Sequence, residues 1–342
     1  MVVALGVAIV AAGLAVVLSS TPPGPSVHVE PQVTFALPPP ATRCNGATAL
    51  SGGGARVPLT VSTVAGQVAE SLDVCIGGHG PFPFVLDSGA GQSTIDAGLA
   101  GRLHLASSGP VSEYAGVGCT GQDQPVSVTT WSLDGVSLEP QQLTSAHLPQ
   151  MGGKGEPMGL LGSDVLSRFG AVRVDFRAGA LVLPGAEGEP LTGVDPVHGP
   201  TGPPPVSLTG GAGTTVPLSV TPVPGNVSLG VAVRFGGGGP RSFVVDTGSS
   251  QSVVSTPVAQ AESLAGTDLA QRQATVCSVI TVPLVHSGAW SVPGMALHPQ
   301  LLGKTAFGSV GLGGIEGLVG SDQLARYGWV VLDYEGALMV LG

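Results

Sequence analysis

The sequence has little charge. Only 10% of its 342 residues are Asp, Glu, Lys or Arg, against roughly 25% in an ordinary soluble domain, and Lys occurs only at Lys154 and Lys304. The net charge is −10 and no basic cluster is present, so we expect no nucleic-acid partner. Scarce Lys together with 55 Gly and 30 Pro excludes long helices and coiled coils. Because 43% of the residues are apolar, disorder throughout is also excluded, and a turn-rich β protein remains.

Several catalytic and cofactor motifs are missing as well. The sequence has no H-E-x-x-H and no G-x-S-x-G, the usual signatures of zinc proteases and serine hydrolases. Residues 116–121 fit G-x-G-x-x-G but do not open a helix of a βαβ unit, and Gly303-Lys304-Thr305 lacks the first Gly of a P-loop. No C-x-x-C pair occurs. We therefore expect no metal and no organic cofactor.

The N-terminal part of the sequence is apolar and then rich in Pro. Residues 2–18 are all apolar or small, and no basic segment precedes them. This run is short for a membrane span and slightly long for a signal-peptide core. We expect residues 1–21 to be a signal peptide or a retained membrane anchor, and residues 22–54 to be a Pro/Gly-rich spacer. The protein would then be exported, either secreted or anchored to the outer face of the cytoplasmic membrane. A buried core helix is the alternative interpretation.

The sequence also repeats itself. Phe84-Val85-Leu86-Asp87-Ser88-Gly89 returns 159 residues later as Phe243-Val244-Val245-Asp246-Thr247-Gly248, and the segment 159–164 returns 158 residues later as 317–322. One residue of slippage indicates two copies of one unit rather than a solenoid. We expect an N-terminal lobe over 55–185, a linker over 186–213 and a C-terminal lobe over 214–342.

Each copy has mostly strand signals. Ser321 or Asp322 can cap one short helix that ends at Gly328. The fold class is therefore all-β, with two homologous β-barrel lobes related by a pseudo-twofold axis and one short helix in each. In the second copy the expected strands are 216–220, 229–235 and 241–245, followed by a hairpin over 329–334 and 337–341.

In each copy a buried strand leads into an Asp-Ser/Thr-Gly turn, and an apolar-apolar-Gly segment follows 74 or 75 residues later. One such turn is weak evidence, because Asp- and Gly-rich turns are common. Two turns at equivalent positions of a repeat, each with its second element, are strong evidence. With these motifs the sequence from about residue 55 to 342 resembles the pepsin and retropepsin aspartic proteases, in a single-chain, two-lobed bacterial form. The resemblance implies pepsin/retropepsin-like β-barrel lobes with the active site between them.

The resemblance also implies roles for the two turns. As an aspartic endopeptidase, the protein would use Asp87 and Asp246 to share a proton and to activate a water that attacks a peptide carbonyl. The hydroxyl of Ser249 can reach Asp246, which would make Asp246 the more readily ionised carboxyl. The residues that support the turns are Ser88, Gly89, Thr247, Gly248 and Ser249. Flaps over the substrate are expected 25 to 35 residues after each Asp, with Tyr114 and Gly116 as candidate substrate-binding residues in the first flap.

Four cysteines allow up to two disulfides and three pairings in an oxidising compartment. Cys119 and Cys277 are nearly equivalent in the repeat, which makes a bond between them one candidate, and Cys44 with Cys75 is the other. The sequence alone does not decide the connectivity.

Two interpretations of the function follow. The first is a monomeric endopeptidase whose partners are peptide or protein substrates, with a membrane contact through the N-terminal segment. The alternative is a non-catalytic peptide- or protein-binding module of the cell envelope with the same bilobal fold. Asp164 and Asp322 are expected to be helix-start residues rather than catalytic ones.

Overall fold

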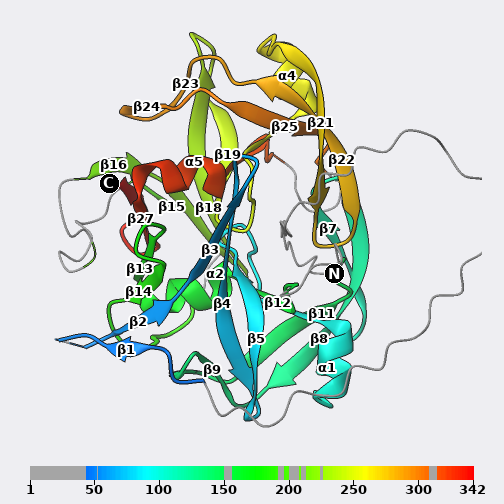
Figure 1. Ribbon diagram of the computed structural model, residues 1–342, viewed down its shortest axis with the longest axis vertical. Helices are drawn as coiled ribbons and strands as arrows, with labels where there is room; N and C mark the ends of the chain where they lie inside the picture. The colour runs from blue at the N-terminus through cyan, green and yellow to red at the C-terminus, as the bar shows by residue number, and fades with distance from the viewer. Residues whose placement is uncertain are drawn as a thin grey trace, which may run out of the picture.

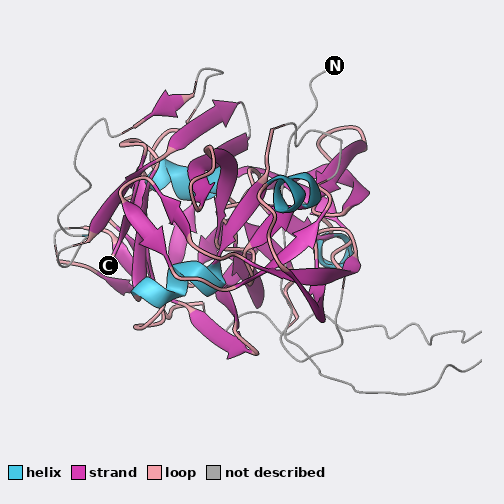
Figure 2. Cartoon of the chain, turned by 90° about the horizontal axis from the view of Figure 1, so that it is seen from above, coloured by secondary structure: helices cyan, strands magenta, loops and turns pink. Residues whose placement is uncertain are grey.

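The computed structural model describes residues 44–51, 53–149, 156–191, 196–199, 208, 213–223, 226–307 and 314–342. Strands dominate these residues, and the helices are short (Figure 2). The chain forms two β lobes and a sheet that both lobes share. The expected signal peptide or anchor, residues 1–21, and most of the spacer lie outside the described residues. Within the described residues, no helix is long and apolar enough to cross a membrane.

The first lobe is built on one sheet, which we call the first-lobe sheet. Its strand order is β10-β9-β4-β5-β12-β6-β11-β8-β7, and β3 pairs with β4. A short helix, α1 (Ala97–Arg102), follows β6, and α2 (Ser163–Leu166) with the 3-10 turn η1 (Ser167–Phe169) follows β12. The strands are β3 (Thr60–Val64), β4 (Gln67–Ile76), β5 (His79–Leu86), β6 (Thr94–Asp96), β7 (Ser112–Gly116), β8 (Cys119–Val128), β9 (Trp131–Leu133), β10 (Val136–Leu138), β11 (Gln141–Ala146) and β12 (Gly159–Leu161).

The second lobe repeats this arrangement in the second-lobe sheet, in the order β15-β17-β18-β19-β26-β20-β25-β22-β21. In addition, β23 pairs with β18, and β24 pairs with β23. Its helices are α4 (Thr256–Ala261) and α5 (Ser321–Leu324), the latter followed by η2 (Ala325–Tyr327). The strands are β15 (Val197–His198), β17 (Ser219–Val223), β18 (Asn226–Phe235), β19 (Arg241–Asp246), β20 (Val253–Ser255), β21 (Gly266–Ala274), β22 (Val279–His286), β23 (Trp290–Val292), β24 (Met295–Leu297), β25 (Leu301–Thr305) and β26 (Gly317–Gly320).

A third sheet, the shared sheet, joins the lobes along the left side of Figure 1. At its centre β13 of the first half pairs antiparallel with β27 of the second half, Arg173 opposite Val331. This pairing places the pseudo-twofold axis between β13 and β27. In order, its strands are β1 (Thr48–Ala49), β2 (Ala55–Pro58), β14 (Ala180–Leu183), β13 (Ala171–Asp175), β27 (Trp329–Asp333), β28 (Leu338–Leu341) and β16 (Thr214–Pro217).

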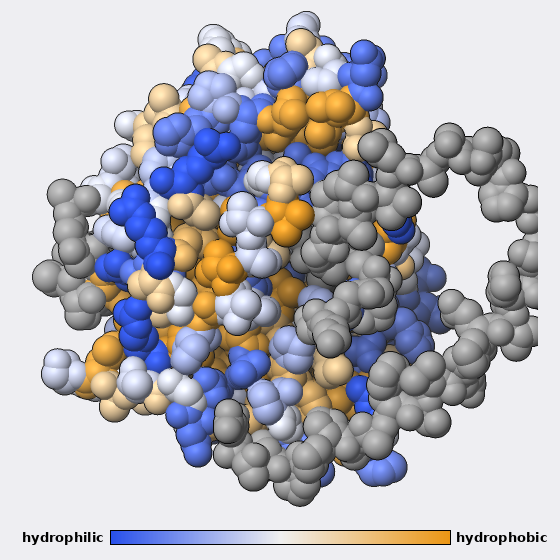
Figure 3. Space-filling view, viewed as in Figure 1, coloured by the Kyte–Doolittle hydropathy of each residue, from blue (hydrophilic) through white to orange (hydrophobic). Residues whose placement is uncertain are grey.

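Alternating apolar side chains of these strands fill a core that continues from one lobe into the other. In both lobes a glycine lets a Phe ring lie against the neighbouring strand. A Cβ on Gly159 would lie 2.2 Å from the ring of Phe84, and a Cβ on Gly317 would lie 2.2 Å from the ring of Phe243. The core therefore brings β12 close to β5, and β26 close to β19. On the face seen in Figure 3, hydrophobic residues lie in separate groups among hydrophilic ones.

The all-β, two-lobed fold is the one expected, but two details differ. Each lobe has a second short helix in the described residues, α1 or α4, which the sequence interpretation missed. The sequence of α1 does not indicate a helix, because it contains Gly98 and Gly101 and glycine is a poor helix former. In α4 the signal was present, since Ser255 caps the helix and Pro257 lies in its first turn. The expected strand 216–220 is divided at Leu218 into β16 and β17, which belong to different sheets.

Candidate active site

The two Asp turns lie at the ends of equivalent strands. Asp87 follows β5, and Asp246 is the last residue of β19. Strand β12 runs parallel to β5 and β26 runs parallel to β19, so that the apolar-apolar-Gly segments lie beside the turns. The N–H of Asp87 donates to the carbonyl oxygen of Leu161 at 2.9 Å. These buried strands fix both Asp residues at the junction of the lobes.

Hydrogen bonds tie the two turns to each other. The N–H of Ser88 donates to Oγ1 of Thr247 at 2.9 Å, and the N–H of Thr247 donates to Oγ of Ser88 at 3.0 Å. Each hydroxyl then donates across the axis, Ser88 to the carbonyl of Val245 at 2.9 Å and Thr247 to the carbonyl of Leu86 at 2.7 Å. All of these groups are buried, where hydrogen bonds hold geometry firmly. The structure thus brings the two predicted turns together.

Glycine at the third position of each turn allows the two carboxyl groups to approach. A Cβ on Gly89 would lie 2.3 Å from the carboxyl carbon of Asp246, and a Cβ on Gly248 would lie 2.3 Å from that of Asp87. Any larger residue would displace the opposite carboxyl group. Both glycines are therefore required by the close approach of the turns.

Each carboxyl group has one oxygen held by the backbone. Oδ1 of Asp87 accepts from the N–H of Ala90 at 2.8 Å, and Oδ1 of Asp246 accepts from the N–H of Ser249 at 3.0 Å. Both side chains are fully buried. Oδ2 of Asp87 and Oδ2 of Asp246 receive no hydrogen bond from an N–H or O–H group in the described part of the chain. These two oxygens are the free acceptors of the site.

Burial raises the pKa of both carboxyl groups. The pKa of Asp87 lies well above its ordinary value because of desolvation, and the neighbouring Asp246 raises it further. Desolvation raises the pKa of Asp246 to about 7, while the adjoining Asp87 carboxyl and the N–H of Ser249 lower it. Two such carboxyl groups titrate as a pair, and over a wide pH range they hold one proton between them. The pair can supply an acid and a base side by side.

Part of the first lobe is similar in sequence to a known protease family. Residues 72–168 match the sequence model of a family described as gag-polyprotein putative aspartyl protease. The resemblance to aspartic proteases is confirmed. The match supports protease function, that is, a hydrolase of peptide bonds. Among solved structures, the chain is similar to the aspartic proteinase from Irpex lacteus, with 12% identity and a TM-score of 0.47 over 85% of this chain and 97% of that one. The search of curated proteins gave no match.

One detail expected of the second protease-like turn is wrong. The hydroxyl of Ser249 donates to the carbonyl of Gln251 at 2.6 Å instead of reaching Asp246. Its contribution to Asp246 comes from the backbone N–H alone, which Ala90 also provides for Asp87. The side chain at this position therefore does not distinguish the two carboxyl groups.

Asp164 and Asp322 lie in the first turns of α2 and α5, as expected of helix-start residues, but neither side chain caps its helix. Gly162 and Gly320 occupy the N-cap positions. Oδ1 of Asp164 accepts instead from the N–H and hydroxyl of Ser93, and Asp322 makes the same two bonds with Ser252. The hydroxyls of Ser93 and Ser252 in turn accept from the N–H groups of the two glycines. Burial raises the pKa of Asp164 to about 6 and that of Asp322 to about 7.

Sequence reasoning missed Tyr334 and Glu70, two buried residues behind the protease-like turns. Oγ of Ser163 donates to the carbonyl of Ser88 at 2.8 Å and lies 2.9 Å from the hydroxyl of Tyr334. Oγ of Ser321 lies 3.0 Å from the carbonyl of Thr247 and bonds to Oε1 of Glu70. Tyr334 and Glu70 each reach across from the opposite lobe. Glu70 is a carboxyl group at a buried position of β4, where the other copy of the repeat has Leu229. A comparison of the two copies could therefore have revealed it.

The expected flaps are hairpins, one from each lobe. The first flap is β7 with β8, and the second flap is β21 with β22, beside each other on the right of Figure 1. Tyr114 is buried, and its hydroxyl donates to the carbonyl of Val276 in the second flap at 3.1 Å. Burial raises its pKa to about 12. A Cβ on Gly116 would lie 2.5 Å from Cγ1 of Val276, so both candidate flap residues contact the opposite flap.

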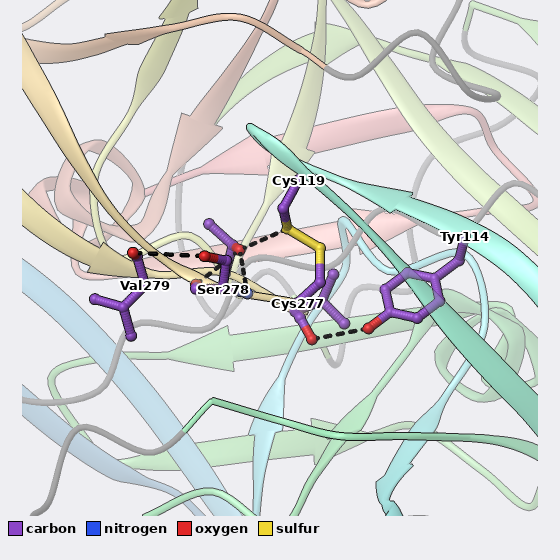
Figure 4. The surroundings of a disulfide bond; sticks show 7 residues. Tyr114, Cys119, Cys277, Ser278 and Val279 are labelled. Atoms are coloured by element: carbon purple, nitrogen blue, oxygen red, sulfur yellow. Dashed lines mark hydrogen bonds between the residues drawn. A yellow bond between two sulfur atoms is a disulfide. The ribbon is translucent and has the colours of Figure 1, made fainter. Parts of the chain in front are cut away.

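Both candidate disulfides are present. Cys44 pairs with Cys75 in the first lobe, with Cα atoms 6.3 Å apart, and Cys119 pairs with Cys277 across the pseudo-twofold axis, with Cα atoms 6.0 Å apart. Figure 4 shows the second bond joining the tips of the two flaps, with Tyr114 beside it. In the described residues, no group of His, Cys, Asp or Glu side chains is arranged to hold a metal ion.

Proposed function

We propose that the protein is an aspartic endopeptidase that hydrolyses peptide bonds with a water held between Asp87 and Asp246. The observation that carries the proposal is the pair of buried carboxyl groups, each with one oxygen fixed by the backbone and one oxygen without a hydrogen-bond donor. A metal-free hydrolase needs a base for the water and an acid for the carbonyl within reach of one water molecule. This pair meets that requirement.

The different environments of the two carboxyls suggest which role each takes. Asp87, whose pKa is raised further, keeps the shared proton and donates it to the scissile carbonyl oxygen. Asp246, the partner that ionises first, accepts a proton from the water. The water oxygen bonds to the carbonyl carbon and gives a tetrahedral diol. Asp246 then transfers that proton to the peptide nitrogen while a diol hydroxyl returns a proton to Asp87, and the C–N bond breaks to release the two products without an acyl-enzyme.

The test is cleavage of a peptide library by the full-length protein between about pH 3 and pH 8, a range that brackets the usual carboxyl pKa values. We expect Asp87→Asn and Asp246→Asn each to lower kcat by about a thousandfold or more, because each removes one member of the acid-base pair. Asp73→Asn, at an exposed carboxyl of β4, is the matched control and should retain activity. Cleavage that survives both active-site substitutions would contradict the proposal.

A further inference from the structure

The tips of the two flaps are joined by a covalent bond as well as by packing. Cys119 begins β8 just after the turn of the first flap, and Cys277 lies in the turn between β21 and β22. Sγ of Cys119 also lies 3.0 Å from Oγ1 of Thr275 in the second flap (Figure 4). Both cysteines are only partly buried. The flaps therefore form one continuous arch between the lobes.

The arch rests on the floor of the candidate active site. In the second flap, Val276 belongs to a hydrophobic cluster with Val85 and Ala90, which flank Asp87 in the first lobe. In the first flap, Val117 pairs with Phe307 and belongs to a cluster with Val244, two residues before Asp246. Each tip thus packs beside the carboxyl group of the opposite lobe. A peptide that reaches the carboxyl pair must lie beneath the arch and lift it.

The disulfide also closes a covalent ring. The chain from Cys119 to Cys277 passes through both lobes and includes Asp246, and the bond between the two sulfurs joins its ends. This part of the chain includes β13, β14 and β16 of the shared sheet, which lies on the left of Figure 1, whereas the flaps lie on the right and β19 lies between. A peptide between the carboxyl pair and the flap tips therefore runs through the ring. Lifting the arch enlarges the ring but does not open it.

We propose that the Cys119–Cys277 bond restricts the site to peptide chains that can be threaded end-first. Linear peptides and unstructured chain ends then reach the carboxyl pair, whereas cyclic peptides and loops closed within a folded protein do not. The proposal rests on the proposed function and deepens it, since it names the class of substrate. It follows from covalent connectivity, so it holds however far the flaps move.

The test compares one peptide in two forms. A linear peptide that the full-length protein cleaves is also closed head-to-tail into a ring of roughly 20 residues, in which about eight residues can lie extended on one side. The ratio of kcat/KM for the linear and cyclic forms is measured under non-reducing conditions for the wild type and for Cys119→Ser/Cys277→Ser. Cys44→Ser/Cys75→Ser removes the other disulfide and is the matched control.

For the wild type we expect the cyclic form to be cleaved at least about 100-fold more slowly than the linear form, and for Cys119→Ser/Cys277→Ser we expect the two rates to agree within about threefold. The Cys44→Ser/Cys75→Ser control should behave as the wild type does. The wild type reduced by a dithiol, which becomes a disulfide itself as the bridge becomes two thiols, repeats the comparison without substitution.

Two results would overturn the proposal. In one, the wild type and the bridge-free variant have the same ratio. In the other, the wild type cleaves neither form while the bridge-free variant cleaves both, which would show that the bridge closes the site to all peptides. If no form of the protein cleaves the linear peptide, the proposed function fails by itself. Binding of the same two peptides with a non-hydrolysable hydroxyl group at the scissile position then decides: binding of the linear form alone supports threading, and binding of both forms, or of neither, overturns it.

Discussion

The two lobes are nearly identical at the turns and different just behind them. Behind the Asp87 turn, Ser163 contacts the phenol of Tyr334, and behind the Asp246 turn, Ser321 contacts the carboxyl of Glu70. In the repeat, the position of Tyr334 corresponds to Phe176. The position of Glu70 corresponds to Leu229 in the same way, so each polar partner replaces an apolar residue of the other copy.

This difference separates two kinds of constraint on a duplicated site. The hydrogen bonds between the turns, and the glycines that let them approach, must be equal on both sides because they set the distance between the carboxyl groups. The groups behind the turns are free to differ, and there the copies have diverged. Burial raises the pKa of Glu70 well above its ordinary value, and Asp246 raises it further, so that Glu70 of the first lobe holds an additional proton behind the Asp246 turn.

The largest expected effect tests the equality of the turns. Gly89→Ala and Gly248→Ala should each lower kcat/KM at least about 100-fold, and to a similar extent, because the new Cβ displaces the opposite carboxyl by an ångström or more. Gly101→Ala and Gly237→Ala, where a Cβ meets open space, are the controls in the two lobes. A large loss from only one of the two turn variants would break the symmetry of the site.

The next effect tests the hydrogen bonds between the turns. Ser88→Ala and Thr247→Val each remove two buried hydrogen bonds across the axis and leave their partners unsatisfied. We expect each to lower the free energy of unfolding by about 2 kcal/mol or more, measured by urea denaturation. Ser62→Ala, whose hydroxyl makes one exposed contact at 3.4 Å, should change it little. Unequal losses would mean that one lobe contributes more to the junction.

The smallest effect concerns the difference behind the turns. The folded pKa of Glu70 is raised above its usual value of 4.5. Above that pH the unfolded chain has lost this proton and the folded chain still holds it, so the free energy of unfolding falls as pH rises. The fall reaches about 1.4 kcal/mol per pH unit for one group. We therefore expect Glu70→Gln to lose stability less steeply than the wild type as pH rises from about 4.5.

Tyr334→Phe is the matched control for that measurement. The phenol titrates far above this pH range, because burial raises its pKa above the usual value of 10.0. Its slope of unfolding free energy against pH should therefore parallel that of the wild type, although the lost contact with Ser163 lowers stability at every pH. Parallel slopes for Glu70→Gln and the wild type would show that Glu70 holds no additional proton in the folded state.

The sequence predicted the features that repeat. Because Asp87 and Asp246 recur at one offset with the same neighbours, the sequence indicated the all-β lobes and the two turns, and it named Cys119 with Cys277 as one candidate pair. These signals are local or periodic, and the repeat places them in equivalent positions of the fold. The division into lobes at 55–185 and 214–342 stays a prediction.

The features that the sequence did not predict depend on contacts between the copies. Nothing local to Glu70 or Tyr334 shows that each reaches a serine of the opposite lobe. The resemblance to pepsin-like proteases implies a contact between the hydroxyl of Ser249 and Asp246, but that hydroxyl donates to the carbonyl of Gln251 instead. Asp is a common helix-capping residue, but the carboxyl groups of Asp164 and Asp322 accept hydrogen bonds from Ser93 and Ser252 instead. Each of these serines is far from its Asp in the sequence, so the residues around the Asp do not indicate the contact.

The pairing of β13 with β27 has a consequence for how such a chain can arise. Arg173 lies opposite Val331, its own equivalent in the repeat, and Ala171 lies opposite Asp333, the equivalent of Asp175. The register is therefore the one that two identical copies of the half would adopt, as in an isologous twofold dimer. Fusion of two subunits into one polypeptide would preserve this ladder unchanged, and only after fusion can one half acquire a carboxyl group where the other keeps a leucine.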